Sequence, residues 1–386
     1  MAKGCPKWSH ARKSPLSCIP SGTALHHASR RGQPEIIHLL CAASACVSAV
    51  DERGRTALHA AAGENESEAC VALISHGAQC EAECALEATP LIEAIEQGHA
   101  ACAAALLQHG ARVDALDPLS LAGLGALVGP DGEAASAPAE GLADSTLDGL
   151  PLEFAQQAAR MAPVLRRLLV ENAPPSQASV RAVLRASGLP LNAQTAAWRN
   201  LARPSSELLM RRPALDAAAC AALRAAIDEA CEGDAASEDS VDGLREFQLN
   251  LTSSRLRTII GATALRELTI ELPARFLALS VAPGAPPPAS LHPYQIFARR
   301  YSAATRPWFT FHSDVATLTA NIALCSDAAH QGGKLLALFE GAVHEIARSE
   351  GEATVHPSTL LHGVTRMRGG ARYSLLLFFS SSGVHP

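Results

Sequence analysis

The chain contains the quartet Thr23-Ala24-Leu25-His26 and repeats it, at a spacing of 33 residues, as Thr56-Ala57-Leu58-His59 and Thr89-Pro90-Leu91-Ile92. An Ala-rich stretch follows each quartet, and a second apolar stretch follows that one. Gly77 and Gly110 end the second stretch in two copies, where glycine supplies the left-handed turn that stops a helix. Because period and phase agree three times, the sequence predicts a stacked array of helix pairs.

The quartets resemble the Thr-Pro-Leu-His turn of the ankyrin repeat, and the resemblance covers roughly residues 20–117. It implies that His26 and His59 brace adjacent repeats through hydrogen bonds and do not ligate a metal. It also implies a concave surface that grips a protein substrate or partner. We therefore expect an all-α ankyrin solenoid over residues 21–118, with no chemistry of its own.

The segments that flank the array have different compositions. Residues 1–20 are basic without an apolar core, which predicts a disordered leader and leaves an organellar address open beside a cytoplasmic or nuclear location. Residues 119–147 are rich in Gly, Ala, Ser and Pro and read as an exposed insertion. Residues 148–175 repeat the helix pair in degenerate form and are expected to close the array, and residues 176–212 are expected to be a helical bridge.

The bulk composition excludes several classes of partner. The chain has 386 residues, a formal net charge of −6 and a pI near 6.2, so it has no basic field that would attract nucleic acid or anionic lipid. No apolar run approaches the length needed to span a bilayer. Its 11 cysteines are odd in number and scattered, which favours reduced thiols. We expect a monomer that binds neither nucleic acid nor membrane.

His312-Ser313-Asp314 is the only His-x-Asp or His-x-Glu triplet in the chain. His362 lies 48 residues beyond Asp314, and Arg372 follows ten residues later. Two imidazoles and one carboxylate on one face of a metal leave coordination positions open for a co-substrate and O₂, as in non-haem Fe(II) oxygenases. These residues are therefore candidate catalytic metal ligands, with Arg372 as a candidate for binding a carboxylate.

Short apolar segments surround the candidate ligands and predict strands. They cover residues 295–301, 308–312, 318–324, 334–338, 360–364 and 372–379. Gly-rich turns separate several of them, which is typical of a β-barrel or β-sandwich. An Ala-rich helix over residues 217–232 precedes them.

This region resembles the jelly-roll, or double-stranded β-helix, domain of the Fe(II)- and 2-oxoglutarate-dependent dioxygenases, in particular the prolyl 4-hydroxylase and procollagen lysyl hydroxylase group. The resemblance rests on the order of His312-Ser313-Asp314, Asn321-Ile322-Ala323-Leu324, Gly332-Gly333, His356-Pro357, His362-Gly363 and Gly370-Ala371-Arg372-Tyr373. It implies a multidomain protein, with a dioxygenase domain over residues 213–384 whose core covers residues 290–380. His312, Asp314 and His362 would ligate Fe(II), and Arg372 would pair with the distal carboxylate of 2-oxoglutarate.

Four further residues are candidates for contacts with 2-oxoglutarate. Ser374 shares a strand face with Arg372, and Tyr301 stands where related hydroxylases keep a Tyr that binds the co-substrate. Thr319 and Asn321 alternate on the strand after Asp314. His356 competes with His362 as the distal ligand, because Arg366 follows it by ten residues. We favour His362, because a hairpin through Gly369-Gly370 would bring it beside Arg372.

The resemblance implies hydroxylation of an unactivated C–H bond, coupled to decarboxylation of 2-oxoglutarate to succinate and CO₂. Fe(II), 2-oxoglutarate and O₂ would be required, and L-ascorbate commonly keeps the iron reduced in this group. The ankyrin repeats would recruit a protein for prolyl or lysyl hydroxylation. Two alternatives remain open at this point, a protein-binding scaffold with an inactive jelly-roll domain and an oxygenase for a small molecule.

Overall fold

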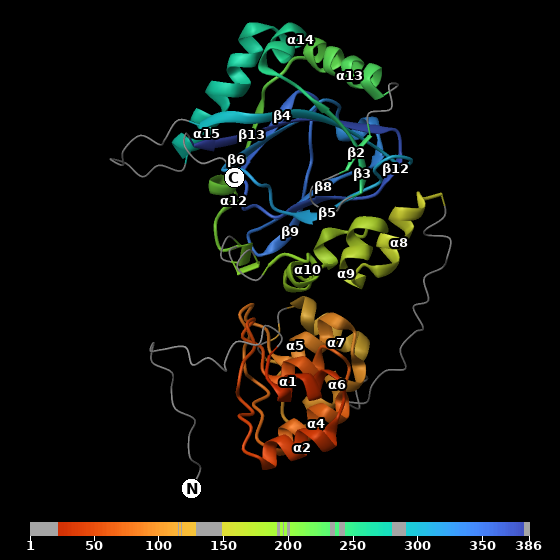
Figure 1. The fold of residues 1–386 in the computed structure, drawn as a ribbon, viewed down its shortest axis with the longest axis vertical. Coiled ribbons are helices and arrows are strands. Elements are labelled where there is room, and N and C mark those ends of the chain that lie inside the picture. Colours follow the sequence, from red (N-terminus) through yellow and green to blue (C-terminus); the bar gives the residue numbers. More distant parts are fainter. Residues whose placement is uncertain are drawn as a thin grey trace. The chain divides into compact units, whose positions relative to one another are not determined.

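A computed structural model describes residues 22–114, 116, 118–128, 149–190, 194–195, 197–198, 201–231, 236–238, 244–279 and 291–381 (Figure 1). The chain divides into two compact units, Met1–Gly141 and Leu142–Pro386. The predicted leader and residues 129–147 of the predicted insertion lie outside the described residues. None of the described helices is both long enough and apolar enough to cross a membrane.

The first unit is built from stacked helix pairs. The pairs are α1 (Ala24–Arg30) with α2 (Pro34–Ala42), α3 (Ala57–Ala62) with α4 (Ser67–Ser75), and α5 (Pro90–Gln97) with α6 (Ala100–Gln108). The first helices pack on one another in the order α1, α3, α5, and the second helices in the order α2, α4, α6 (Figure 1). Alanine, leucine and cysteine side chains fill the space between them, and their small size lets the helices approach closely.

Histidine side chains join consecutive repeats. The backbone N–H of Thr23 donates to His26 Nδ1 at 3.2 Å, so the ring hydrogen is on Nε2, which donates to the carbonyl of Arg55 at 2.8 Å. His59 repeats this arrangement one repeat later and reaches the carbonyl of Ala88 at 2.9 Å. Both side chains are fully buried. The prediction that these histidines brace the repeats is confirmed.

Another helix follows the third pair. Helix α7 (Pro118–Leu127) packs on α5 and α6, and Leu124 and Val128 join the core of the array. A Cβ on Gly123 would lie 2.9 Å from Ile95 Cγ2, so glycine permits this close approach. Residues 119–127 were predicted to be part of an exposed insertion, and this helix was not predicted, because glycine and proline lower its apparent helical propensity.

The second unit begins with short helical segments. They are α8 (Leu152–Arg160), α9 (Pro163–Leu165), the π-helical turn η2 (Arg166–Val170), the 3₁₀ turn η3 (Pro175–Gln177), α10 (Val180–Ala186) and α12 (Ser205–Leu208). Phe154 packs edge-on against Trp308, with ring centroids 5.2 Å apart, and Trp308 Nε1 donates to Gln157 Oε1 at 2.8 Å. Of residues 148–175, predicted to close the repeat array, the described part (149–175) therefore packs with the β-sheet unit. Their role as a last repeat stays a prediction.

Phe154→Ala is expected to lower the free energy of unfolding of the second unit by about 3–5 kcal/mol, because it empties a fully buried site beside Trp308. Leu152→Ala on the same helix is the matched control. Leu152 is 74% exposed, so its replacement should change stability by less than about 0.5 kcal/mol. Urea unfolding followed by circular dichroism measures both. Equal stability of the two variants would show that α8 does not belong to this unit.

The larger sheet of the second unit is antiparallel and has the strand order β1-β10-β6-β13-β4-β3-β2. Its strands are β1 (Met210–Pro213), β10 (Glu352–Pro357), β6 (Leu318–Ala323), β13 (Ala371–Ser381), β4 (Leu291–Ser302), β3 (Arg245–Asn250) and β2 (Ala236–Glu238). Strand β1 pairs with β10 at one edge. Residues 210–212 of the predicted helical bridge are thus part of the sheet.

The smaller sheets supply the opposite layer. One has the order β5-β11-β8-β9, with β5 (Phe309–His312), β11 (His362–Val364), β8 (Leu335–Phe339) and β9 (Ala342–Ile346). The other pairs β12 (Met367–Gly369) with β7 (Gln331–Gly332), and the 3₁₀ turn η5 (Asp327–Ala329) precedes β7. All the predicted strands are therefore present in the β-sheet unit. The strands that were not predicted are β1, β2, β3, β7, β9, β10 and β12.

The two faces of the larger sheet differ in chemistry, because side chains alternate along each strand. The apolar face carries Ile322, Val355, Leu375 and Leu377, and it packs against helices. These helices are α13 (Ala217–Cys231), α14 (Ser253–Arg266), η4 (Glu267–Glu271) and α15 (Leu272–Leu279) (Figure 1). The other face is polar although it is buried. A buried polar face of this kind indicates a binding or catalytic site.

Candidate metal centre

Three side chains converge between β5 and β11. His312 ends β5, Asp314 follows two residues later, and His362 begins β11 directly opposite His312. Asp314 Oδ1 lies 3.6 Å from His312 Nε2 and 3.9 Å from His362 Nε2. One donor atom from each residue lies within 4.8 Å of the others, and the described residues contain no other such group of His, Cys, Asp or Glu. This group could hold a metal ion.

Backbone carbonyls hold both imidazoles with Nε2 toward Asp314. His312 Nδ1 donates to the carbonyl of Thr310 at 2.9 Å, and His362 Nδ1 donates to that of Leu360 at 3.1 Å. Because a carbonyl only accepts, each Nδ1 carries a ring hydrogen, and Nε2 is the ring nitrogen that is directed at Asp314. Burial, reinforced by His362, lowers the pKa of His312 to about 3, so its imidazole is neutral near pH 7.

Asp314 keeps one oxygen free for a cation. Thr319 Oγ1, from β6, donates to Asp314 Oδ2 at 2.6 Å, which leaves Oδ1 facing the imidazoles. Burial alone would raise the pKa of Asp314, but His362, His312 and the Thr319 hydrogen bond outweigh it and hold this pKa below its usual range. An ionised carboxylate beside two imidazole nitrogens is a suitable donor set for a divalent cation.

His356 lies beside this group on a different strand. Its ring centroid is 4.9 Å from that of His362, and its Nδ1 donates to the carbonyl of Pro357 at 3.1 Å. Burial, then His362, lowers its pKa to about 4. The group of three contains His362 and not His356, as favoured from the sequence. The hairpin argument for that choice was wrong, because β11 and β13 lie in different sheets.

The polar face of the larger sheet carries the other candidates. Register places Arg372 opposite Tyr301, and Ser374 between Arg299 and Ala323. Two residues further along β13, Leu376 lies opposite Asn321, and beyond it Phe378 lies opposite Thr319. The alternation thus puts Arg372, Ser374, Tyr301, Asn321 and Thr319 on one buried face. Thr319, which hydrogen-bonds Asp314, lies at one end of this face, and Arg372 lies at the other end.

Arg372 is a buried cation with free hydrogen-bond donors. Its side chain is 1% exposed, and within the described part of the chain its Nε and Nη2 have no hydrogen-bond partner. Its Cζ lies 4.9 Å from the centroid of the Tyr301 ring. Burial, then the charge of Arg348, lowers the pKa of Arg372 to about 10, so it remains charged near pH 7. A carboxylate would stabilise a buried guanidinium of this kind.

Asn321 and Ser374 differ in the partners they have. Asn321 is 6% exposed, and its Oδ1 has no hydrogen-bond partner in the described residues. Ser374 is fully buried, and its Oγ accepts a hydrogen bond from Arg348 Nη1 at 3.3 Å. Asn321 therefore retains hydrogen-bonding capacity on the face between Asp314 and Arg372. The Ser374 hydroxyl thus already accepts one hydrogen bond. Its donor, Arg348, was not among the residues predicted from the sequence.

Gly332 and Gly333 form the predicted Gly-Gly turn. They pack so closely against neighbouring residues that a side chain would not fit at either position. Gly332 has a φ of +73°, and a Cβ there would lie 1.9 Å from the Arg366 carbonyl oxygen. Gly333 has a φ of +64°, and its Cβ would lie 2.1 Å from Met367 Sδ and 3.4 Å from Arg372 Cδ. The absence of side chains lets this turn pack against the Arg372 stem.

Gly332→Ala is therefore expected to destabilise the second unit by more than about 4 kcal/mol, because a backbone atom blocks the new methyl group. Gly341→Ala isolates the steric part. Gly341 has nearly the same φ, +72°, and no atom within 4 Å of its Cβ position, so only the conformational cost of about 1–2 kcal/mol should remain. Thermal unfolding of both variants measures the difference. A similar loss in both would contradict the packing described here.

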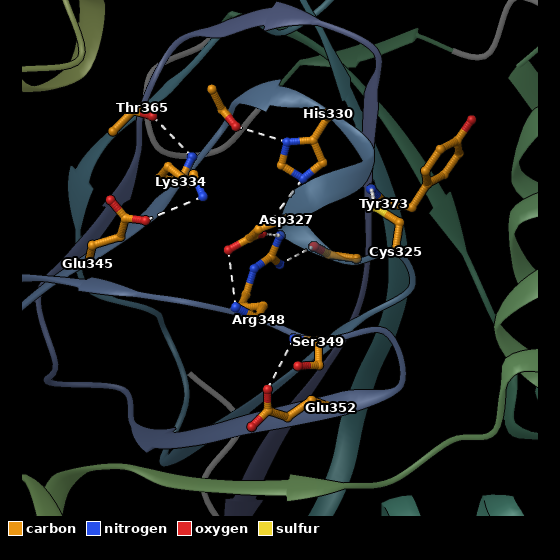
Figure 2. Close-up of polar contacts among 12 residues, drawn as sticks. Cys325, Asp327, His330, Lys334, Glu345, Arg348, Ser349, Glu352, Thr365 and Tyr373 are labelled. Atoms are coloured by element: carbon orange, nitrogen blue, oxygen red, sulfur yellow. Dashed lines mark hydrogen bonds and ion pairs between the residues drawn. The ribbon is translucent and has the colours of Figure 1, made fainter.

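A buried charged cluster that was not predicted from the sequence lies near Arg372. Asp327 in η5, His330 after it, and Arg348 after β9 are all at most 9% exposed (Figure 2). Arg348 Nη2 donates to Asp327 Oδ1 at 3.2 Å, and His330 Nε2 lies 3.7 Å from the same oxygen. A charged residue between two predicted strands normally indicates a surface turn, so local pattern alone did not reveal the burial of Arg348.

Comparison with known families identifies the first unit. A model of ankyrin repeats matches residues 25–117 in three copies. The N-terminal part of the chain is thus composed of ankyrin repeats, as predicted, and such repeats imply a protein partner. The match ends before the β-sheet unit.

The β-sheet unit has no family match that would identify its activity, and no curated protein matches the chain. The C-terminal part is therefore defined by its structure, an antiparallel β-sheet domain with a group of His312, Asp314 and His362 suited to a metal.

Proposed function

We propose that the second unit is an Fe(II)- and 2-oxoglutarate-dependent dioxygenase, with His312, Asp314 and His362 as the metal ligands. The observation that carries the proposal is the combination of this donor set with the buried, unpartnered guanidinium of Arg372. Two imidazoles and one carboxylate suit Fe(II) and leave positions for further ligands. The guanidinium suits the distal carboxylate of a dicarboxylic co-substrate.

The strand arrangement supports a double-stranded β-helix around this site, with its core over residues 290–380. The strands β4, β6, β10 and β13 belong to the larger sheet, and β5, β8, β9 and β11 to the smaller one. The chain passes repeatedly between the two sheets, as in jelly rolls. In this arrangement the ligands come mainly from the smaller sheet and the carboxylate-binding residues from the larger one.

The chain's own residues would bind and orient the reactants. Arg372 would pair with the distal carboxylate, with Ser374 and Tyr301 beside it, and Asn321 would face the middle of the co-substrate. The burial of this face would exclude water. When bound, Fe(II) would supply the oxidation of a C–H bond by O₂, coupled to conversion of 2-oxoglutarate to succinate and CO₂, with L-ascorbate keeping the iron reduced.

We propose that the ankyrin repeats recruit the protein that is hydroxylated, on a prolyl or lysyl side chain. A surface groove of ≈ 540 Å³ supports binding by the second helices of the repeats, α2, α4 and α6. Its lining includes Val71, Ala104 and Ala105 together with the polar His38 and Glu68. The exposed Leu39 lies on α2, which contributes His38 to the same groove. An apolar segment with flanking polar groups fits such a surface.

Succinate release from 2-oxoglutarate tests the enzymatic part of the proposal. The wild-type protein with Fe(II), O₂ and ascorbate should release succinate, and Asp314→Ala should not. Absence of turnover by wild-type protein that binds iron would favour the scaffold alternative. Proteins captured by residues 1–141 would then be searched by mass spectrometry for the addition of one oxygen atom that depends on Asp314. Turnover without any such protein would favour a small-molecule substrate.

A further inference from the structure

Arg348 forms a buried clasp with Asp327 on the side of the site where Arg372 lies. The backbone N–H of Asp327 donates to the carbonyl of Arg348 at 3.1 Å, and the backbone N–H of Arg348 donates to Asp327 Oδ2 at 3.0 Å. Arg348 Nη2 completes the clasp by donating to Asp327 Oδ1 at 3.2 Å (Figure 2). The first two bonds fix the Arg348 backbone, and the third holds its side chain, of which only 1% is exposed.

A different Arg348 nitrogen, Nη1, reaches Ser374. Arg348 Nη1 donates to Ser374 Oγ at 3.3 Å, so the Ser374 hydroxyl acts as an acceptor in this bond. Its own hydrogen must then point to a different acceptor. Ser374 shares the buried polar face with Arg372, whose Nε and Nη2 have no partner within the described part of the chain. A carboxylate between these two residues would accept from both.

The charges of the side chains in this cluster also favour a carboxylate beside Arg372. Asp327 compensates the charge of Arg348, and burial keeps His330 neutral by lowering its pKa. Arg372 then carries the one uncompensated charge among these four residues. A single carboxylate would make the cluster neutral.

We propose that Arg348 is a positioning residue for the co-substrate, acting through Ser374: clasped by Asp327, it orients the Ser374 hydroxyl so that its hydrogen is donated to the carboxylate bound by Arg372. This inference rests on the proposed function, since it assumes that 2-oxoglutarate binds at this site. Arg348 itself does not contact the co-substrate. Its effect on affinity therefore requires Ser374.

Arg348→Lys tests the proposal. Lysine keeps the positive charge beside Asp327, but its single nitrogen cannot replace both guanidinium contacts. Binding of 2-oxoglutarate is measured by calorimetry on protein loaded with Zn²⁺ as a redox-inert probe, together with thermal unfolding. We expect Arg348→Lys and Ser374→Ala each to raise the Kd about tenfold, the typical effect of losing one charge-assisted hydrogen bond. In the double variant the Kd should also rise by only about tenfold relative to wild type, because both changes remove the same interaction.

Arg211→Lys is the matched control, because Arg211 also pairs with a carboxylate, that of Glu352, but on the exposed edge strand β1. It should leave the Kd unchanged. A wild-type Kd in Arg348→Lys despite lower thermal stability, or a hundredfold loss in the double variant, would overturn the positioning role. If Arg348→Lys does not fold, a wild-type Kd in Ser374→Ala overturns it equally. Failure of wild-type protein to bind 2-oxoglutarate would instead overturn the proposed function itself.

Discussion

Arg372→Met is expected to stabilise the free protein and, at the same time, to weaken 2-oxoglutarate binding. The guanidinium is buried with two unpartnered nitrogens, and its lowered pKa means that the charged form is less stable in the folded than in the unfolded chain. Replacement by a similarly long apolar side chain should therefore raise the free energy of unfolding by about 1–4 kcal/mol. The Kd for 2-oxoglutarate should rise at least about 30-fold, because the bound carboxylate loses its charged partner.

Arg300→Met provides the comparison on the adjacent strand. Arg300 points to the opposite face and contacts Asp228 and Tyr373 near the surface. Its replacement should not change the Kd and should not stabilise the protein. Thermal unfolding and calorimetry on the same preparations measure both quantities. If Arg372→Met were destabilising while the affinity stayed unchanged, Arg372 would be a structural residue and not a carboxylate-binding one.

His362→Ala and Asp314→Ala are expected to abolish tight metal binding, whereas His356→Ala is expected to retain it. Loss of one ligand of three removes several kcal/mol of metal affinity, which corresponds to about a thousandfold or more in Kd. His356 is equally buried and touches His362, but it is not one of the three converging donors, so its replacement should cost at most about tenfold. The two histidine variants are thus matched in chemistry and burial.

Equilibrium dialysis against Zn²⁺, with metal analysis of the protein, measures these affinities. Circular dichroism controls for folding. The opposite ranking, with metal lost in His356→Ala and kept in His362→Ala, would assign the distal ligand to His356 and would refute the site described here.

The sequence predicted the ankyrin unit in more detail than the β-sheet unit, for a physical reason. In the repeats, each stabilising contact recurs at a fixed separation, as when His26 reaches the carbonyl of Arg55 and His59 reaches that of Ala88. A fixed separation is visible as a sequence period. The helix α7 breaks the period, and it was missed.

In the β-sheet unit, local alternation was sufficient to predict strands but not their partners. The metal group was found because His312 and Asp314 are only two residues apart in sequence and His362 lies within a strand pattern. Their convergence depends on the pairing of β5 with β11, which spacing does not encode. The hairpin expected between His362 and Arg372 does not form, because their strands, β11 and β13, belong to different sheets.

The cluster around Asp327 and Arg348 could not have been predicted, because a charged pair separated by 21 residues has no signature when its burial is unknown. The attachment of α8 to Trp308 is similarly a long-range packing contact, over 154 residues from Phe154 to Trp308. Both depend on how the sheets and helices are assembled.

The central claim is that the metal group and Arg372 form a single site for one dicarboxylic co-substrate. Calorimetric titration of 2-oxoglutarate into the 386-residue chain, with and without bound Zn²⁺, tests it most directly. We expect one molecule bound per chain, with an affinity at least about tenfold higher when the metal is present, since one end of the co-substrate would bind the metal and the other Arg372. Binding that does not depend on the metal, or no binding to the metal-loaded protein, would contradict the account.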